Sequence, residues 1–206
     1  MAITYPLSLP TQAGIRSVQL RANDLVSMNM SPFSAKQQVY KYTGQYWEAD
    51  ISLPPMKRDD AEYWITFLMK LNGSYGTFLL GDPNAATPRG VATGTPVVNG
   101  ASQTGYELVT DGWTPSTTGI LKAGDYIQLG TGEDSRLYKV LDDVDSDGSG
   151  NATLDLWPNL RSSPDDNATI ITTNCKSVFR LSTNVTEINI DEASIYGVTF
   201  GALESL

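Results

Sequence analysis

Apolar and polar residues alternate along several stretches of this chain. The alternation is clearest over residues 47–53, and it recurs at 17–22 and 26–30. A period of two gives a strand one packed face and one solvated face, which is typical of antiparallel sheets. Pro54 and Pro55 then end the longest run, because proline cannot donate a hydrogen bond to a neighbouring strand. The first part of the chain is therefore predicted to form an antiparallel sheet.

One segment has helical periodicity instead. Asp59, followed three residues later by Glu62, resembles a capping box, and Asn72-Gly73 supplies a left-handed stop. Between them an apolar stripe is formed by Ala61, Trp64, Ile65, Leu68 and Leu71. We expect a helix over residues 59–71 that lies across the sheet and covers it.

The second half of the chain shows more short strand patterns. A strand-like segment at 77–80 is followed by residues 81–105, where Gly and Pro mark loops or short hairpins. Further strands are predicted at 126–129, 137–141, 152–157, 178–181, 187–190 and 195–200. The connections among the first three of these are rich in Gly and Asp, as in a small barrel or sandwich.

These patterns predict a mainly β protein in two parts. The simplest arrangement is a discontinuous core domain of residues 1–84 plus 166–206, an antiparallel β-sandwich-like core with one covering helix. Residues 85–165 would then form an inserted small β-barrel or sandwich module. Two consecutive domains also fit the sequence.

The charge balance disfavours some functions. The chain has 14 Lys plus Arg against 23 Asp plus Glu, a formal net charge of −9, and no basic run of five or more. Nucleic-acid binding needs clustered basic residues, so we expect no nucleic-acid partner. The start shows no secretory signal, and no run of 18 apolar residues occurs. We expect a chain made in the cytoplasm without membrane insertion.

Catalytic and metal-binding motifs are also missing from the sequence. Histidine is absent, which removes the commonest general base and the commonest zinc ligand. The single cysteine, Cys175, rules out an intramolecular disulfide and is interpreted as a small buried hydrophobe. There is no nucleophile elbow, phosphate loop or dinucleotide fingerprint. We therefore expect no catalytic residues, no cofactor and no enzymatic activity.

A glycosidase with paired carboxylates needs no histidine and survives these exclusions. Glu48 and Asp50 lie two residues apart on one predicted strand and share a face. An alternating strand turns its polar face to water, so we interpret both as solvated charges.

One acidic segment partly matches a calcium-binding loop. Asp143, Asp145, Asp147 and Gly148 occupy positions 1, 3, 5 and 6 of an EF-hand pattern. Position 12 is Leu154, however, where a bidentate Glu belongs. The alternative is an acidic turn between two strands, where Asp, Ser and Gly are common, and we favour that alternative.

Trp113 is the candidate contact for a partner. The other tryptophans occupy apolar positions typical of a core, whereas Trp113 lies among turn-forming residues in Asp111-Gly112-Trp113-Thr114-Pro115. Such a residue could serve as an exposed aromatic anchor.

A longer segment carries a resemblance to a known family. Residues 31–83 contain Gly44-Gln45-Tyr46-Trp47-Glu48-Ala49, the Pro-Pro break, the Trp64 helix, and Gly76-Thr77-Phe78 leading to Gly81-Asp82-Pro83. This arrangement resembles the small distal or minor tail proteins of long-tailed bacteriophages. Later segments, among them residues 119–130, 136–161 and 190–204, are similar to the same proteins.

The resemblance implies a structural role in the virion. Proteins of that family form a ring, commonly sixfold, at the tip of the tail tube, and the ring joins the tube to the baseplate hub or fibres. The expected partners are therefore further copies of this chain, the tail tube protein and the baseplate hub proteins, with a location at the tail tip. As an alternative, residues 85–165 form a module that binds carbohydrate or a host surface.

Overall fold

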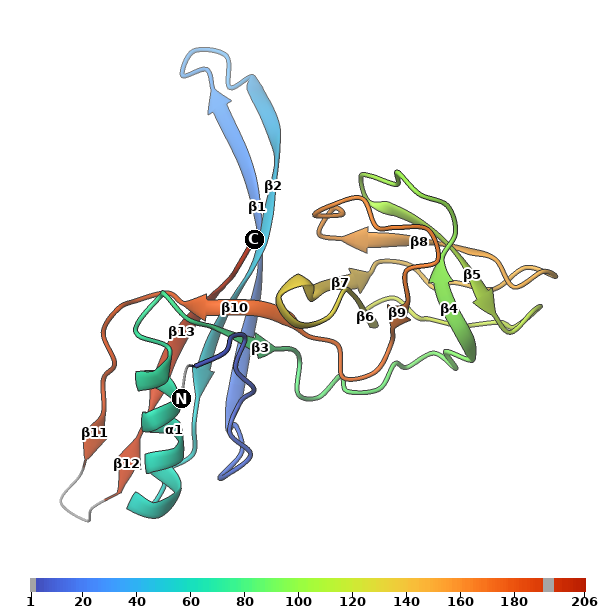
Figure 1. Ribbon diagram of the computed structural model, residues 1–206. Helices are drawn as coiled ribbons and strands as arrows, with labels where there is room; N and C mark the ends of the chain where they lie inside the picture. The colour runs from blue at the N-terminus through green and yellow to red at the C-terminus, as the bar shows by residue number, and fades with distance from the viewer. Residues whose placement is uncertain (1–2, 191–194) are drawn as a thin grey trace.

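A computed structural model of the chain describes residues 3–190 and 195–206. The fold is mainly β, with antiparallel sheets and one helix, as the sequence predicts (Figure 1). The first sheet has five strands in the order β1 (Ser17–Met30), β2 (Gln37–Ser52), β13 (Thr199–Glu204), β10 (Ser177–Leu181) and β3 (Thr77–Leu80). The outer side of β3 is bridged by Leu7, so the sequence-distant N-terminal segment covers that edge.

Helix α1 (Arg58–Lys70) packs against this sheet with the predicted apolar stripe buried. Phe67, outside the stripe, is buried as well. The predicted cap is wrong: Lys57 is the N-cap, it makes no side-chain capping bond, and Asp59 lies inside the first turn. There its negative charge still interacts favourably with the helix dipole. No helix in the described part of the chain is long and apolar enough to cross a membrane.

Aromatic side chains fill the space between α1 and the sheet. The Trp64 and Phe67 rings meet edge to face at a centroid distance of 6.0 Å, and Phe67 meets Phe78 at 5.7 Å. The Trp64 indole N–H, buried with its ring, donates to the carbonyl of Gln12 at 2.8 Å. This partner removes the penalty for burying a polar N–H group.

The second sheet has six strands and almost closes into a barrel. Its order is β4 (Gly94–Val98), β5 (Glu107–Trp113), β8 (Ala152–Trp157), β7 (Arg136–Val140), β6 (Tyr126–Leu129) and β9 (Ile170–Ile171). A bridge between Val97 and Thr169 brings the two edge strands together, and the Val98 N–H donates to the Ala168 carbonyl at 2.9 Å. A separate apolar core fills its interior. A short 3-10 helix, η1 (Gly132–Asp134), precedes β7.

The chain leaves the first sheet at β3 and returns to it at β10, and these two strands are paired neighbours. The residues between them form the second sheet. Its last strand, β9, follows residue 165, so this sheet extends beyond the boundary that the sequence suggested. The missed strands β4 and β5 lie among Gly- and Pro-rich residues, where turn signals hide short strands.

The C-terminal strands are shorter than predicted. The segments expected at 187–190 and 195–200 correspond to β11 (Asn189–Ile190), β12 (Tyr196–Gly197) and the start of β13. Strands β11 and β12 pair with each other, and Tyr196 also bridges to Met56, ahead of α1.

Cys175 lies in the core where the two sheets meet, as the sequence interpretation expects. Burial raises the pKa of its thiol to about 12. Because the thiolate is the reactive form, we predict that the folded protein does not react with a thiol reagent at pH 8 and that the unfolded protein reacts fully. Rapid labelling without denaturant, followed by mass spectrometry, would contradict this placement.

Candidate assembly surfaces and the junction between the sheets

Strands β1 and β2 form a long antiparallel hairpin whose far end projects from the rest of the molecule (Figure 1). We call residues 25–43 the distal hairpin. It begins at an irregularity in the ladder between Asp24 and Val26. Gly44 lies opposite this point, where an added Cβ would come within 2.5 Å of the Leu25 side chain. A larger residue at position 44 would require the exposed Leu25 side chain to move.

One face of the distal hairpin carries four exposed apolar side chains. Met28 pairs with Val39, and alternate residues of a strand share a face, so Val26 and Met30 lie beside them, together with their cross-strand partners Lys41 and Gln37. The four apolar side chains are all exposed, Met28 to 60%. The opposite face carries Ser27, Asn29, Gln38, Tyr40 and Tyr42.

The turn at the end of the hairpin has a defined structure. The Ser31 N–H donates to the Lys36 carbonyl and the Ala35 N–H donates to the Ser31 carbonyl, both at 2.9 Å. Phe33 at this turn is 99% exposed. A two-stranded ribbon with apolar residues in water is marginal on its own, and a large exposed apolar patch usually marks a contact surface.

A groove lies at the other end of the same two strands. It has a volume of about 660 Å³. We call it the basal groove; it is lined by Ser17, Gln19, Asp50, Ile51, Ser52, Leu68, Leu181, Thr183, Val185, Thr186, Glu187, Thr199, Phe200 and Gly201. Two of these residues are acidic, and none is basic.

The two carboxylates considered for glycoside chemistry are held by one arginine. Arg21 on β1 donates to Glu48 at 2.8 Å and also contacts Asp50. Asn23 donates to the second oxygen of Glu48 at 3.1 Å. Both carboxylates are partly solvated on the open face of the sheet, in keeping with the sequence interpretation.

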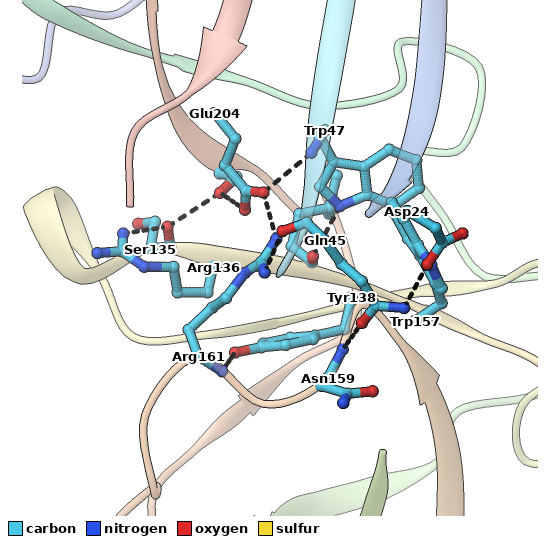
Figure 2. A network of polar contacts seen from close by, with 12 residues as sticks. Asp24, Gln45, Trp47, Ser135, Arg136, Tyr138, Trp157, Asn159, Arg161 and Glu204 are labelled. Atoms are coloured by element: carbon cyan, nitrogen blue, oxygen red, sulfur yellow. Dashed lines mark hydrogen bonds and ion pairs between the residues drawn. The ribbon is translucent and has the colours of Figure 1, made fainter. Parts of the chain in front are cut away.

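The second sheet joins the first through a network of buried polar contacts (Figure 2). Its centre is an ion pair between Arg161, which follows β8, and Glu204 at the end of β13, with 2.6 Å between Nη2 and Oε2. The Glu204 side chain is completely buried. Its carboxylate also accepts the Trp47 backbone N–H and the Ser177 hydroxyl, each at 3.0 Å.

Arg161 has further partners on both sides of the junction. Its Nη1 donates to the Gln45 carbonyl on β2, and its backbone N–H donates to the Tyr138 hydroxyl at 3.1 Å. Burial raises the pKa of Tyr138 above its ordinary value, so this phenol stays neutral across the physiological range. The Arg161 Nε is buried and has no hydrogen-bond partner among the residues that the structure describes.

Tryptophans and amides surround this ion pair (Figure 2). The Trp47 indole N–H donates to the Leu137 carbonyl at 3.0 Å, and its ring meets the Trp157 ring edge to face at 4.4 Å. Gln45 accepts the Asn159 backbone N–H at 2.8 Å and donates to Asp24 at 2.7 Å. The apolar and polar contacts together fix the barrel against the middle of β2.

The acidic segment that partly matched a calcium loop forms turns. The Asp143 carboxylate accepts the Ala123 N–H at 2.8 Å, and that of Asp145 accepts the Gly119 N–H at 2.6 Å. Asp147 accepts N–H groups from Ser149 and Asn151, both at 2.8 Å. Within residues 3–190 and 195–206, no group of three or more Cys, Asp or Glu could hold a metal ion.

The expectation of an exposed Trp113 is wrong. Trp113 is the last residue of β5 and only 3% exposed, with its indole N–H donating to the Thr110 hydroxyl at 2.8 Å. The neighbouring Gly112, at φ 75°, allows close approach to the Thr95 backbone. The turn residues around Trp113 thus serve strand pairing within the barrel.

The antiparallel strands predicted for the first part of the chain include those of the distal hairpin, but sequence reasoning missed the hairpin's projection into solvent and the junction network. The pattern at 26–30 predicted one packed face, whereas the side chains of Val26, Met28 and Met30 are exposed. The network had no sequence signal, since Arg161 and Glu204 lie 43 positions apart. No model of a known protein family matches the chain, and comparison with curated proteins finds no significant relative.

We predict that Arg161→Met destabilises the protein by about 3 kcal/mol, because it leaves the Glu204 carboxylate buried and unpaired. The double variant Arg161→Met with Glu204→Gln should lose less stability than the sum of the losses in the two single variants. Urea unfolding of all four proteins measures the coupling. Arg58→Met, which breaks an exposed pair with Glu62, is the control and should change stability by under about 1 kcal/mol. Additive effects at Arg161 and Glu204 would contradict the coupling.

We predict that calcium leaves the melting temperature unchanged, whereas Asp147→Ala lowers it. The N–H groups of Asn151 and Ser149 hold the pKa of Asp147 below its ordinary value of 3.8. This contribution to stability is fully present above the ordinary value and is lost as the pH falls through the lower folded value. The difference between the wild type and Asp147→Ala should therefore shrink below pH 4. A calcium-dependent rise in melting temperature that Asp147→Ala abolishes would contradict the turn interpretation.

Proposed function

We propose that this protein is a structural subunit that assembles with further copies of itself, and that its assembly is a ring at the tip of a bacteriophage tail. The observation that carries the proposal is the distal hairpin, whose exposed apolar face is covered by no described part of its own chain. An apolar surface of this kind is stabilised when a partner removes it from water.

The tail-tip location rests on the sequence resemblance. The segments that carry it correspond to the helix, β2 and β3 of the first sheet, together with strands of the barrel. These segments supply packing and turn residues, as a scaffold protein requires. The resemblance further implies that the ring has six members and joins the tail tube to the baseplate hub or fibres.

No specific observation favours the alternative of a carbohydrate- or host-surface-binding module. The aromatic anchor considered for residues 85–165, Trp113, is buried in the barrel core. The basal groove belongs to the first sheet and the segments beside it. We therefore propose a non-catalytic assembly role for the chain as a whole.

We predict that the purified protein self-associates and that Met28→Asp with Val39→Asp weakens the association at least tenfold, because a charge at an apolar contact is left desolvated. Light scattering coupled to size exclusion measures the mass, and negative-stain images show whether the particle is a ring. Asn29→Asp, on the opposite face of the same strand, is the matched control and should associate like the wild type. A monomer at every accessible concentration would overturn the proposed function.

A further inference from the structure

The distal hairpin and the basal groove lie at opposite ends of the same two strands. Ser17 pairs with Ser52 at the groove, and Met30 pairs with Gln37 at the tip. Thirteen residues at about 3.3 Å each separate these pairs by roughly 40 Å. The paired strands, with one irregularity between Asp24 and Val26, hold the two ends apart, so the hairpin does not reach the groove of its own chain. Any contact between them joins two molecules.

Both the groove and the hairpin present apolar side chains. In the groove, Ile51 and Leu181 are almost fully buried, so the accessible apolar lining comes mainly from the partly buried Phe200 and the exposed Val185. The hairpin presents Met28 and Val39 at the centre of one face, with Val26 and Met30 beside them and their partners Lys41 and Gln37 on the same face.

Charge also distinguishes the two surfaces. The distal hairpin contains Lys36 and Lys41 and no acidic residue. The remaining residues hold 12 Lys plus Arg against 23 Asp plus Glu, a formal charge of −11. In the groove, Asp50 is already bound by Arg21, whereas Glu187 is exposed and forms no ion pair with any described residue. Glu187 is therefore the groove carboxylate available to a lysine of the distal hairpin.

We propose that the distal hairpin of one copy inserts its apolar face into the basal groove of the next copy. This inference rests on the proposed self-assembly and adds the site on the neighbouring molecule. The contact is heterologous, because each copy gives a hairpin at one end and receives one at the other. Heterologous contacts close into a ring when the rotation between copies fits and otherwise form an open filament.

Mixed single variants test the contact directly. A Met28→Cys chain is mixed with a Val185→Cys chain under mild oxidation, and we expect a disulfide-linked heterodimer on a non-reducing gel. The buried Cys175, with its thiol pKa raised to about 12, does not compete. Asn29→Cys mixed with Val185→Cys is the matched control, because Asn29 faces the other side of the strand, and it should give at most a tenth of the product.

A charge exchange provides the second test. Glu187→Lys should weaken self-association about tenfold, as should Lys36→Glu with Lys41→Glu. Combining all three changes in one chain should restore most of the affinity, because the attraction is re-formed with its signs exchanged. The four melting temperatures are measured alongside to show that each chain is folded.

The outcomes separate this inference from the proposed function. If the wild type forms particles but the Met28→Cys and Val185→Cys chains do not cross-link and the combined chain is no tighter than its parents, the groove is not the acceptor and self-assembly stands. If the wild type remains a monomer throughout, both proposals fail. Cross-linking that exceeds the Asn29→Cys control, together with recovery in the combined chain, supports the inference.

Discussion

The ladder between β1 and β2 is the interaction on which the other features depend. Its basal half forms part of the first sheet, where Trp47 and Ile51 of β2 are buried under α1 and the barrel. Its distal half continues into solvent as an antiparallel pair whose register shifts between Asp24 and Val26. The paired core residues hold the ribbon in register, because a slip by one residue would turn every buried side chain outward. A hairpin anchored in this way keeps a fixed direction that an isolated ribbon would lose.

The polar junction favours one relative orientation of the two sheets, but burying its charges costs folding free energy. A buried ion pair such as Arg161–Glu204 repays its desolvation only when other hydrogen bonds complete its geometry. Glu204 has those bonds from Trp47 and Ser177, whereas the Arg161 Nε has none within residues 3–190 and 195–206. Apolar residues in place of Arg161 and Glu204 would pack without requiring one relative orientation of the two sheets. The polar network instead fixes how the barrel sits on β2.

Local patterns predicted the fold class and the elements that bury an amphipathic face. The period of two in β2 and the apolar stripe on α1 were sufficient, because each pattern marks one face of its element as buried and the other as solvated. The prediction of strands failed where turn-forming residues dominate the local signal, as they do around β4 and β5. Trp113 was misjudged for the same reason, since its burial depends on strands brought together from residues 94–98 and 152–157.

The distribution of charge limits the ways in which two copies of this chain can meet. Two bodies that each carry the strong acidic excess repel one another, and so do two basic hairpins. Only the pairing of a hairpin with a body joins opposite charges, and that pairing is head-to-tail. In the proposed assembly, this repulsion would act over about 10 Å at moderate salt, before any apolar contact forms, and would select the orientation of the encounter. The apolar side chains of Met28 and Val39 would then supply the affinity. Association of this kind would run in one direction, which is the geometry that a closed ring requires.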